Sequence, residues 1–220
     1  MKRATPILLS LNAGYVDTAG FLALQGLFAA HVTGNFVTLG MALVSGASGI
    51  WAKILALPVL CLIVFISKLL ASSMPKLGLP VLRTLLSFKV LFLIAAAVMA
   101  TTISPAHHGD DVHVIITGLL LVCAMALQNS ISRIYTNPVP ATILTGPLTQ
   151  MMIDVADLVR GVAPTEQAIL KARLSTIITN VLSFAVGCGI SAVLFSQIGM
   201  WCFIVPPILA FIPIVIGEVE

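Results

Sequence analysis

The sequence predicts an all-α integral membrane protein with six transmembrane helices plus two short broken or re-entrant helices, arranged as two inverted three-helix repeats. Composition is the first reason: 59% of the 220 residues are hydrophobic and 9% are charged. A soluble domain has about 25% charged residues. So few charges would not cover a water-exposed surface of this size, whereas a surface that faces lipid needs none. The length suits a single membrane domain, residues 1–220.

Hydropathy supplies the second reason. A bilayer core of about 30 Å is crossed by roughly 20 apolar residues in a helix. Six stretches meet this requirement, namely 7–29, 54–74, 81–103, 112–131, 168–195 and 199–217. Two further apolar stretches, 33–46 and 146–158, are shorter, and each follows a Thr-Gly pair directly after a full span.

The distribution of Lys and Arg decides how the spans are oriented. With a cytoplasmic N-terminus and two short stretches that do not cross, all but one of the 11 basic residues lie on the cytoplasmic side, and Lys53 is the exception. If both short stretches crossed, either the 68–83 cluster or the 160–173 cluster would be forced outside. Cytoplasmic loops carry the excess of positive charge, so the six-span arrangement with both termini inside is favoured. It also places Trp51 and Trp201 at the outer interface, where indole rings are common.

Self-similarity is the third reason. When each residue is aligned with the one 112 positions later, Asp17 falls on Asn129 and Thr33-Gly34 falls on Thr145-Gly146. The repeats are approximately residues 5–104 and 112–217. Each contains three spans, so the second enters the membrane from the opposite side. Inverted repeats are typical of secondary transporters, whose sites lie near the midplane. An old duplication in a protein that transports nothing is the alternative.

Asp17 lies about ten residues into the first predicted span. An Asp at the bilayer centre costs about 3 kcal/mol on insertion scales, so it usually faces protein or water. Gln25 lies two turns further along the same helical face, and Gln128 precedes Asn129, the counterpart of Asp17. Asp17 therefore either carries a proton or binds a cationic group, or else it is a structural carboxylate that joins helices.

The two Thr-Gly motifs predict helices that begin inside the membrane. Thr is a good N-cap, Gly allows the backbone to bend, and free N–H groups at a helix start can hold an anion or a carbonyl oxygen. A tight turn that merely packs is the alternative, and His31 is expected to be a hydrogen-bonded structural residue. The predicted substrate-binding residues are Asp17, Gln25, Thr33, Gly34, Asn35, Gln128, Asn129, Thr145 and Gly146.

Several of these motifs resemble the YoaK family of bacterial inner-membrane proteins. The similarity is carried by Asn-Ala-Gly-Tyr-Val-Asp at 12–17, His-Val-Thr-Gly-Asn at 31–35, Gln-Asn at 128–129 and Thr-Gly at 145–146. It covers nearly the whole chain and departs at Thr18, where a small Ala is expected, and at Pro147, which should sharpen the helix start. The resemblance implies a bacterial inner membrane location. That family is a domain of unknown function, so it implies no substrate.

These features together predict a secondary transporter of a small polar metabolite or ion, with or without proton coupling. A passive channel and a non-transporting scaffold or sensor are the alternatives. The sequence has no catalytic triad, P-loop, dinucleotide fingerprint or HExxH motif, so we expect neither an enzyme nor a cofactor or metal. The expected partners are the bilayer, the substrate and a second copy in a homodimer. A net charge of +3 does not suggest nucleic acid.

Overall fold

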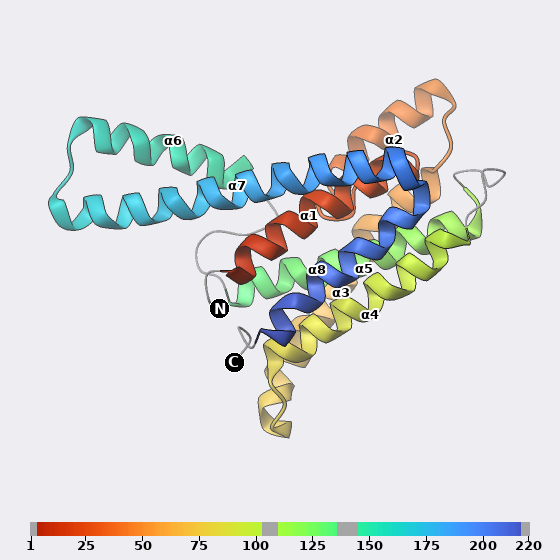
Figure 1. Cartoon of the computed structure of the whole chain (residues 1–220), viewed down its shortest axis with the longest axis horizontal. Helices are drawn as coiled ribbons and strands as arrows, with labels where there is room; N and C mark the ends of the chain where they lie inside the picture. Colours follow the sequence, from red (N-terminus) through yellow and green to blue (C-terminus); the bar gives the residue numbers. More distant parts are fainter. Residues whose placement is uncertain (1–3, 103–109, 136–144, 217–220) are drawn as a thin grey trace.

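The computed structural model describes residues 4–102, 110–135 and 145–216, and every regular element in these ranges is a helix. The first half contains α1 (Ala4–Ala23), α2 (Gly34–Ser45), α3 (Ile50–Ser73), the 3-10 helix η1 (Met74–Leu77) and α4 (Val81–Thr101). The second half contains α5 (Val112–Tyr135), α6 (Thr145–Arg160), α7 (Pro164–Ile198), the 3-10 helix η2 (Gly199–Ile204) and α8 (Val205–Val215). Figure 1 shows their arrangement.

Four helical stretches in the described part of the chain are long and apolar enough to cross a membrane. They are Ile50–Lys76, Val81–Thr101, Val112–Ile134 and Pro164–Val215. The last of these runs through α7, η2 and α8. Helix α1 has 20 residues, about 30 Å at 1.5 Å per residue, but its polar residues lower its hydropathy. The fold is that of a helical protein with membrane-spanning segments.

Helix α1 ends at Ala23, six residues before the end of the predicted span at 7–29. The next residues explain this difference, because Gln25 and Gly26 have φ angles of 56° and 78°. Gly adopts this left-handed region without penalty, whereas a side chain such as that of Gln25 is uncommon there. The chain therefore leaves the helix inside the predicted span and continues as the irregular segment 24–33, which we call the broken segment.

The two halves pack into one bundle (Figure 1). Helix α1 runs along α7, and α3 runs along α5. Helix α4 lies against both α5 and α8, and α8 also contacts α1. Helix α2 packs on α3, and α6 packs on α7. In Figure 1 the α6 helix and the N-terminal part of α7 form a hairpin that extends beyond the bundle. Arg173 of α7 joins the two helices of this hairpin, because it donates two hydrogen bonds, of 2.5 and 2.6 Å, to Asp154 of α6.

Helices α1 and α7 cross at very short range. A Cβ atom added at Gly14 would lie 2.1 Å from the carbonyl oxygen of Phe184, and one added at Gly187 would lie 2.0 Å from that of Leu11. Small residues at helix crossings let backbones approach in this way. Tyr15 also donates a 2.8 Å hydrogen bond to the carbonyl of Cys202. These contacts with the second half fix the position of helix α1 and, with it, the position of the broken segment that follows.

Candidate functional site

Asp17 holds the broken segment in place. Its Oδ1 atom accepts hydrogen bonds from the backbone N–H groups of Ala29 and Ala30, at 2.8 and 2.6 Å. Its Oδ2 atom accepts the N–H of His31 at 3.2 Å and lies 2.6 Å from His31 Nδ1. The Asp17 side chain is only 4% exposed. One buried carboxylate therefore satisfies three backbone donors and one imidazole.

Asn35 also holds the broken segment in place through hydrogen bonds. Its Oδ1 accepts the N–H of Phe28 and its Nδ2 donates to the carbonyl of Phe28, both at 2.8 Å. The N–H groups of residues 34–36 donate to the carbonyls of residues 31–33. Helix α2 begins at Gly34 as predicted, with Thr33 in the N-cap position, but the Thr33 side chain makes no capping hydrogen bond. The N–H groups at the start of α2 are also not free to hold a ligand, since backbone carbonyls take them.

His31 lies between two cavities. The first, of about 380 Å³, is bounded by the broken segment, α3 and α5, and we call it the basic cavity. Its lining residues are Ala30, His31, Val32, Thr33, Leu57, Leu60, Val64, Lys68, Asn129, Ser130, Arg133 and Ile134. The second, of about 510 Å³, is the Asp17 cavity, and it is lined by Asp17, Thr18, Phe21, Leu22, Phe28, His31, Gly34, Phe184 and Cys188. The His31 side chain is 32% exposed, and its ring packs edge-on against Phe184.

Four of the predicted site residues lie at these cavities. Asp17 and Gly34 line the Asp17 cavity, whereas Thr33 and Asn129 line the basic cavity. Asp17 and Asn129 are thus on different sides of His31. Asp17 can therefore be both a structural carboxylate and a binding group. Its carboxylate joins α1 to the broken segment through hydrogen bonds, and the residue also lines a cavity.

The other predicted residues lie elsewhere. Asn35 is buried under the broken segment, and Gln25 sits exposed at the end of α1. Thr145 and Gly146 are exposed at the start of α6, which packs on α7, and they line neither cavity. The residues that precede Thr145, 136–144, are outside the described residues. The structure therefore does not bring the second Thr-Gly motif to the cavities that contain the first.

Lys68 and Arg133 are not among the site residues predicted from the sequence, where they serve only to orient the helices. They line the basic cavity from the C-terminal parts of α3 and α5. One signal could have found them: the positive-inside rule places the C-terminal ends of both helices on the same side of the membrane. Which residues of the two ends meet depends on the packing of α3 against α5, which the rule does not supply.

Gln128 is a bridge between helices. Its Nε2 donates to the carbonyl of Leu9 at 2.8 Å, and its Oε1 accepts a hydrogen bond from Lys89 Nζ at 2.5 Å. Gln128 and Lys89 are both completely buried. Gln128 therefore has a structural role at the junction of α1, α4 and α5, where it accepts a hydrogen bond from a buried Lys side chain, and its part in substrate binding stays a prediction.

Replacing Gln128 with Leu is expected to lower the free energy of unfolding by about 2 kcal/mol, because the buried Lys89 ammonium loses its hydrogen bond. The double variant Lys89→Met/Gln128→Leu is expected to recover most of this loss, since an apolar pair can replace a buried polar pair at little cost. Thermal unfolding in neutral detergent would measure both. If the losses of stability in Gln128→Leu and in the single variant Lys89→Met added up to that of the double variant, the proposed coupling of these side chains would be refuted.

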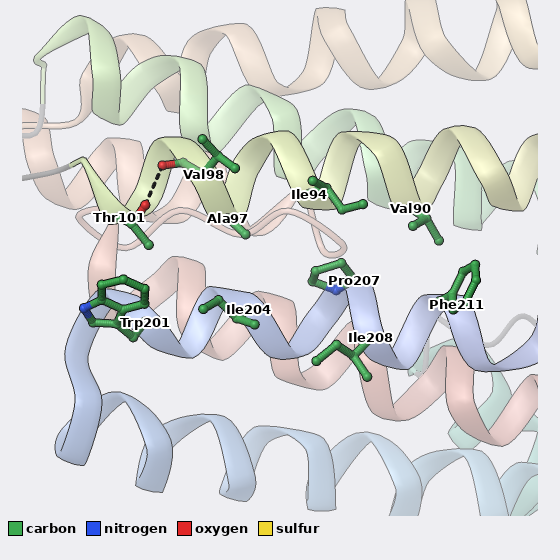
Figure 2. A pocket seen from close by; sticks show the side chains of 10 residues that line it. All are labelled: Val90, Ile94, Ala97, Val98, Thr101, Trp201, Ile204, Pro207, Ile208 and Phe211. Atoms are coloured by element: carbon green, nitrogen blue, oxygen red, sulfur yellow. Dashed lines mark hydrogen bonds between the residues drawn. The ribbon is translucent and has the colours of Figure 1, made fainter.

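A larger cavity of about 580 Å³ lies between α4 and α8 (Figure 2), and it is an apolar groove. Aliphatic and aromatic side chains line it along both helices, including Ile94, Ile208 and Phe211. The Thr101 hydroxyl already donates to the carbonyl of Val98 at 2.7 Å. Such a lining suits hydrocarbon and offers little to orient a polar solute, so the groove is not the candidate site.

Helices long and apolar enough to span a bilayer, packed around the buried Asp17 and the partly exposed His31, are those of a multi-pass membrane protein with polar side chains inside its bundle. A family model described as "Protein of unknown function (DUF1275)" matches residues 5–216. The chain therefore belongs to this family. No curated protein and no solved structure matches it.

Proposed function

We propose that this protein is a small secondary transporter of a polar metabolite or ion, with its site where the basic cavity and the Asp17 cavity meet. The observation that carries the proposal is the position of His31, which lines both cavities and is held by Asp17 at 2.6 Å. A polar group shared by two cavities can be presented to either of them in turn. This is the property that alternating access requires of a midplane site.

The Asp17-His31 pair is suited to proton coupling. Imidazole is the side chain that most readily gains or loses a proton near neutral pH. A proton on His31 is balanced by the Asp17 carboxylate, and the same carboxylate holds the N–H groups of residues 29–31. A change of protonation therefore acts directly on the broken segment. Irregular backbone at membrane depth is tolerated where protein satisfies it or where it lines a cavity, and both conditions apply to this segment.

The packing of the helices supports the inverted repeat. Under the 112-residue offset, α1 to α4 correspond to α5 to α8, with η2 joined to α8. The α1–α7 contact then maps onto α5–α3, the α4–α5 contact onto α8–α1, and the α2–α3 contact onto α6–α7. The α4–α8 and α1–α5 contacts each map onto themselves. This exchange symmetry favours repeats at 5–104 and 112–217. The count is six when α1 is taken as a further span and when α7 is counted separately from η2 and α8.

We place the protein in a bacterial inner membrane with both termini in the cytoplasm, on the evidence of the charge distribution and the motif resemblance to the YoaK family. In this orientation the C-terminal ends of α3 and α5, with Lys68 and Arg133, face the cytoplasm. The basic cavity is then the cytoplasmic of the two. A passive channel and a non-transporting scaffold or sensor are the competing functions, and the following experiment separates them.

The purified protein would be reconstituted in liposomes and supplied with radiolabelled succinate, lactate, glutamate, alanine and putrescine, with and without a pH gradient. We expect saturable uptake of at least one solute and greater accumulation with the gradient. His31→Gln should reduce uptake to the level of protein-free liposomes. His113→Gln is the matched control, because His113 is exposed on α5 and lines neither cavity.

Uptake that does not saturate and ignores the gradient would instead identify a channel. If no solute of this set entered although the protein was monodisperse and correctly folded, the scaffold or sensor would be favoured. Equal uptake by His31→Gln and the wild type would show that the meeting point of the two cavities is not the transport site.

A further inference from the structure

We propose that the basic cavity binds the carboxylate or phosphate group of a small soluble anion, with Lys68 and Arg133 as its charged contacts. The inference rests on the proposed function and specifies the class of solute that the site takes. The sequence leaves the charge of the solute open, since Asp17 suits a cationic group and a helix start suits an anionic one. The geometry of the basic cavity decides between these possibilities.

The charge of the cavity is positive. Its described lining residues include the basic side chains of Lys68 and Arg133 and no carboxylate. The nearest acidic group in the site, Asp17, is buried behind His31, where it accepts three backbone hydrogen bonds. Within the described ranges, the basic partners of the Asp carboxylates are His31, His113 and Arg173. Lys68 and Arg133 are therefore available to a ligand.

The packing of α3 against α5 brings these two cations to one place. Ser67 and Ser130 form a buried hydrogen bond of 2.5 Å between their hydroxyl oxygens, and this bond joins the two helices. Lys68 follows Ser67 directly, and Arg133 lies three residues after Ser130, a spacing that places neighbours on one helical face. Lys68 and Arg133 therefore both lie next to the Ser67–Ser130 hydrogen bond, which fixes the contact of α3 with α5. An Arg fork near a Lys suits a carboxylate or phosphate, which Arg can bind through two parallel hydrogen bonds.

The remainder of the cavity indicates a small organic anion. Leu57, Leu60 and Val64 form an apolar wall along α3, whereas Thr33 and His31 provide polar groups on the side of the broken segment. In the described chain His31 makes its side-chain hydrogen bond through Nδ1, which leaves Nε2 for a ligand. A volume of about 380 Å³ lies within the range of small-molecule sites, about 300–1,000 Å³. A short carbon chain with an anionic end fits these three features.

A lipid headgroup carries the same phosphate chemistry and could also reach two exposed cations near helix ends. The test therefore has two arms on the purified protein in neutral detergent. In the first, sodium succinate, lactate, glutamate or phosphate is compared with sodium chloride at equal ionic strength. In the second, phosphatidylglycerol is compared with phosphatidylcholine. The readout in both arms is the midpoint of thermal unfolding.

We expect at least one soluble anion to raise the Tm of the wild type by about 5 °C when its concentration is about 100 times its Kd. Lys68→Gln/Arg133→Gln should lose this shift. Lys76→Gln/Arg83→Gln is the matched control, since it removes the same charge from η1 and from the start of α4, away from the cavity. The control should keep the shift of the wild type.

Three results would overturn the proposal: no shift beyond that of sodium chloride, an equal shift in the Lys68/Arg133 variant, or a shift with phosphatidylglycerol alone. The uptake experiment separates this failure from that of the proposed function. If the Lys68/Arg133 variant retained saturable uptake of putrescine or alanine, the transport function would be supported and the anion-binding site would be refuted. Anion-dependent stabilisation that needs both cations, without uptake of the same anion, would leave the binding site standing and remove transport.

Discussion

Replacing Asp17 with Ala is expected to lower the free energy of unfolding by about 4 kcal/mol, because three backbone N–H groups lose their acceptor. The N–H groups of Ala29 and Ala30 lie among buried residues, where an unpaired donor costs about 1–3 kcal/mol. For a chain of this length, the Tm in neutral detergent should fall by about 10 °C. Uptake into liposomes should also be lost, since His31 loses its partner.

Two further variants sharpen this test. Asp17→Asn keeps an oxygen for Ala29 and Ala30 but turns an NH₂ group toward the N–H of His31, so we expect about half the loss of stability. Asp157→Ala removes a carboxylate from α6, away from both cavities, and should change stability by no more than about 0.5 kcal/mol. If Asp17→Ala behaved like Asp157→Ala, Asp17 would not organise the broken segment.

Replacing Gly187 with Ala is expected to destabilise the protein by about 3 kcal/mol, since the added methyl group overpacks the crossing of α1 and α7. Its Cβ would lie 2.0 Å from the carbonyl oxygen of Leu11, and backbone cannot rotate away as a side chain can. The two helices must therefore separate. Thermal unfolding would again measure the effect.

Gly189→Ala is a close control, because it lies two residues along the same helix and an added Cβ there meets no atom within 4 Å. Ala is also the better helix former by about 1 kcal/mol, so this variant should be as stable as the wild type or more so. Equal stability of the two variants would show that the α1–α7 crossing is looser than described. We also expect Gly187→Ala to lose uptake, because Phe184 and Cys188 of α7 line the Asp17 cavity.

Hydropathy found the helices because it reports a local property. The predicted stretches 54–74, 81–103 and 112–131 lie within a few residues of α3, α4 and α5. The two halves differ in α7, which continues through Ile190, the residue 112 positions after Gly78. Gly78 has a φ of 68° and precedes a proline by two residues, so the first half turns there. In the second half the chain turns only at Gly199, whose φ is 57°.

The candidate site was predictable only in part. The sequence marks Asp17 and the Thr-Gly-Asn motif as a polar interruption of an apolar chain, and the structure brings them together at the broken segment. The sequence does not indicate what Asp17 binds, because its partners are backbone N–H groups 12 to 14 residues away. The sequence also suggests a free helix start at Thr33, whereas local 3-10 hydrogen bonds already use those donors.

The sequence by itself determined the class of protein, the positions of most helices and the region of the site, since composition, apolar runs and helix-breaking residues act along the chain. Only the tertiary structure decided the partners. Gln128 bonds to Lys89 because α4 packs on α5, and Lys68 and Arg133 line one cavity because α3 packs on α5, where a hydrogen bond joins the two helices. Contacts between distant helices depend on how side chains fit in three dimensions, and a pattern read along one chain does not contain that information.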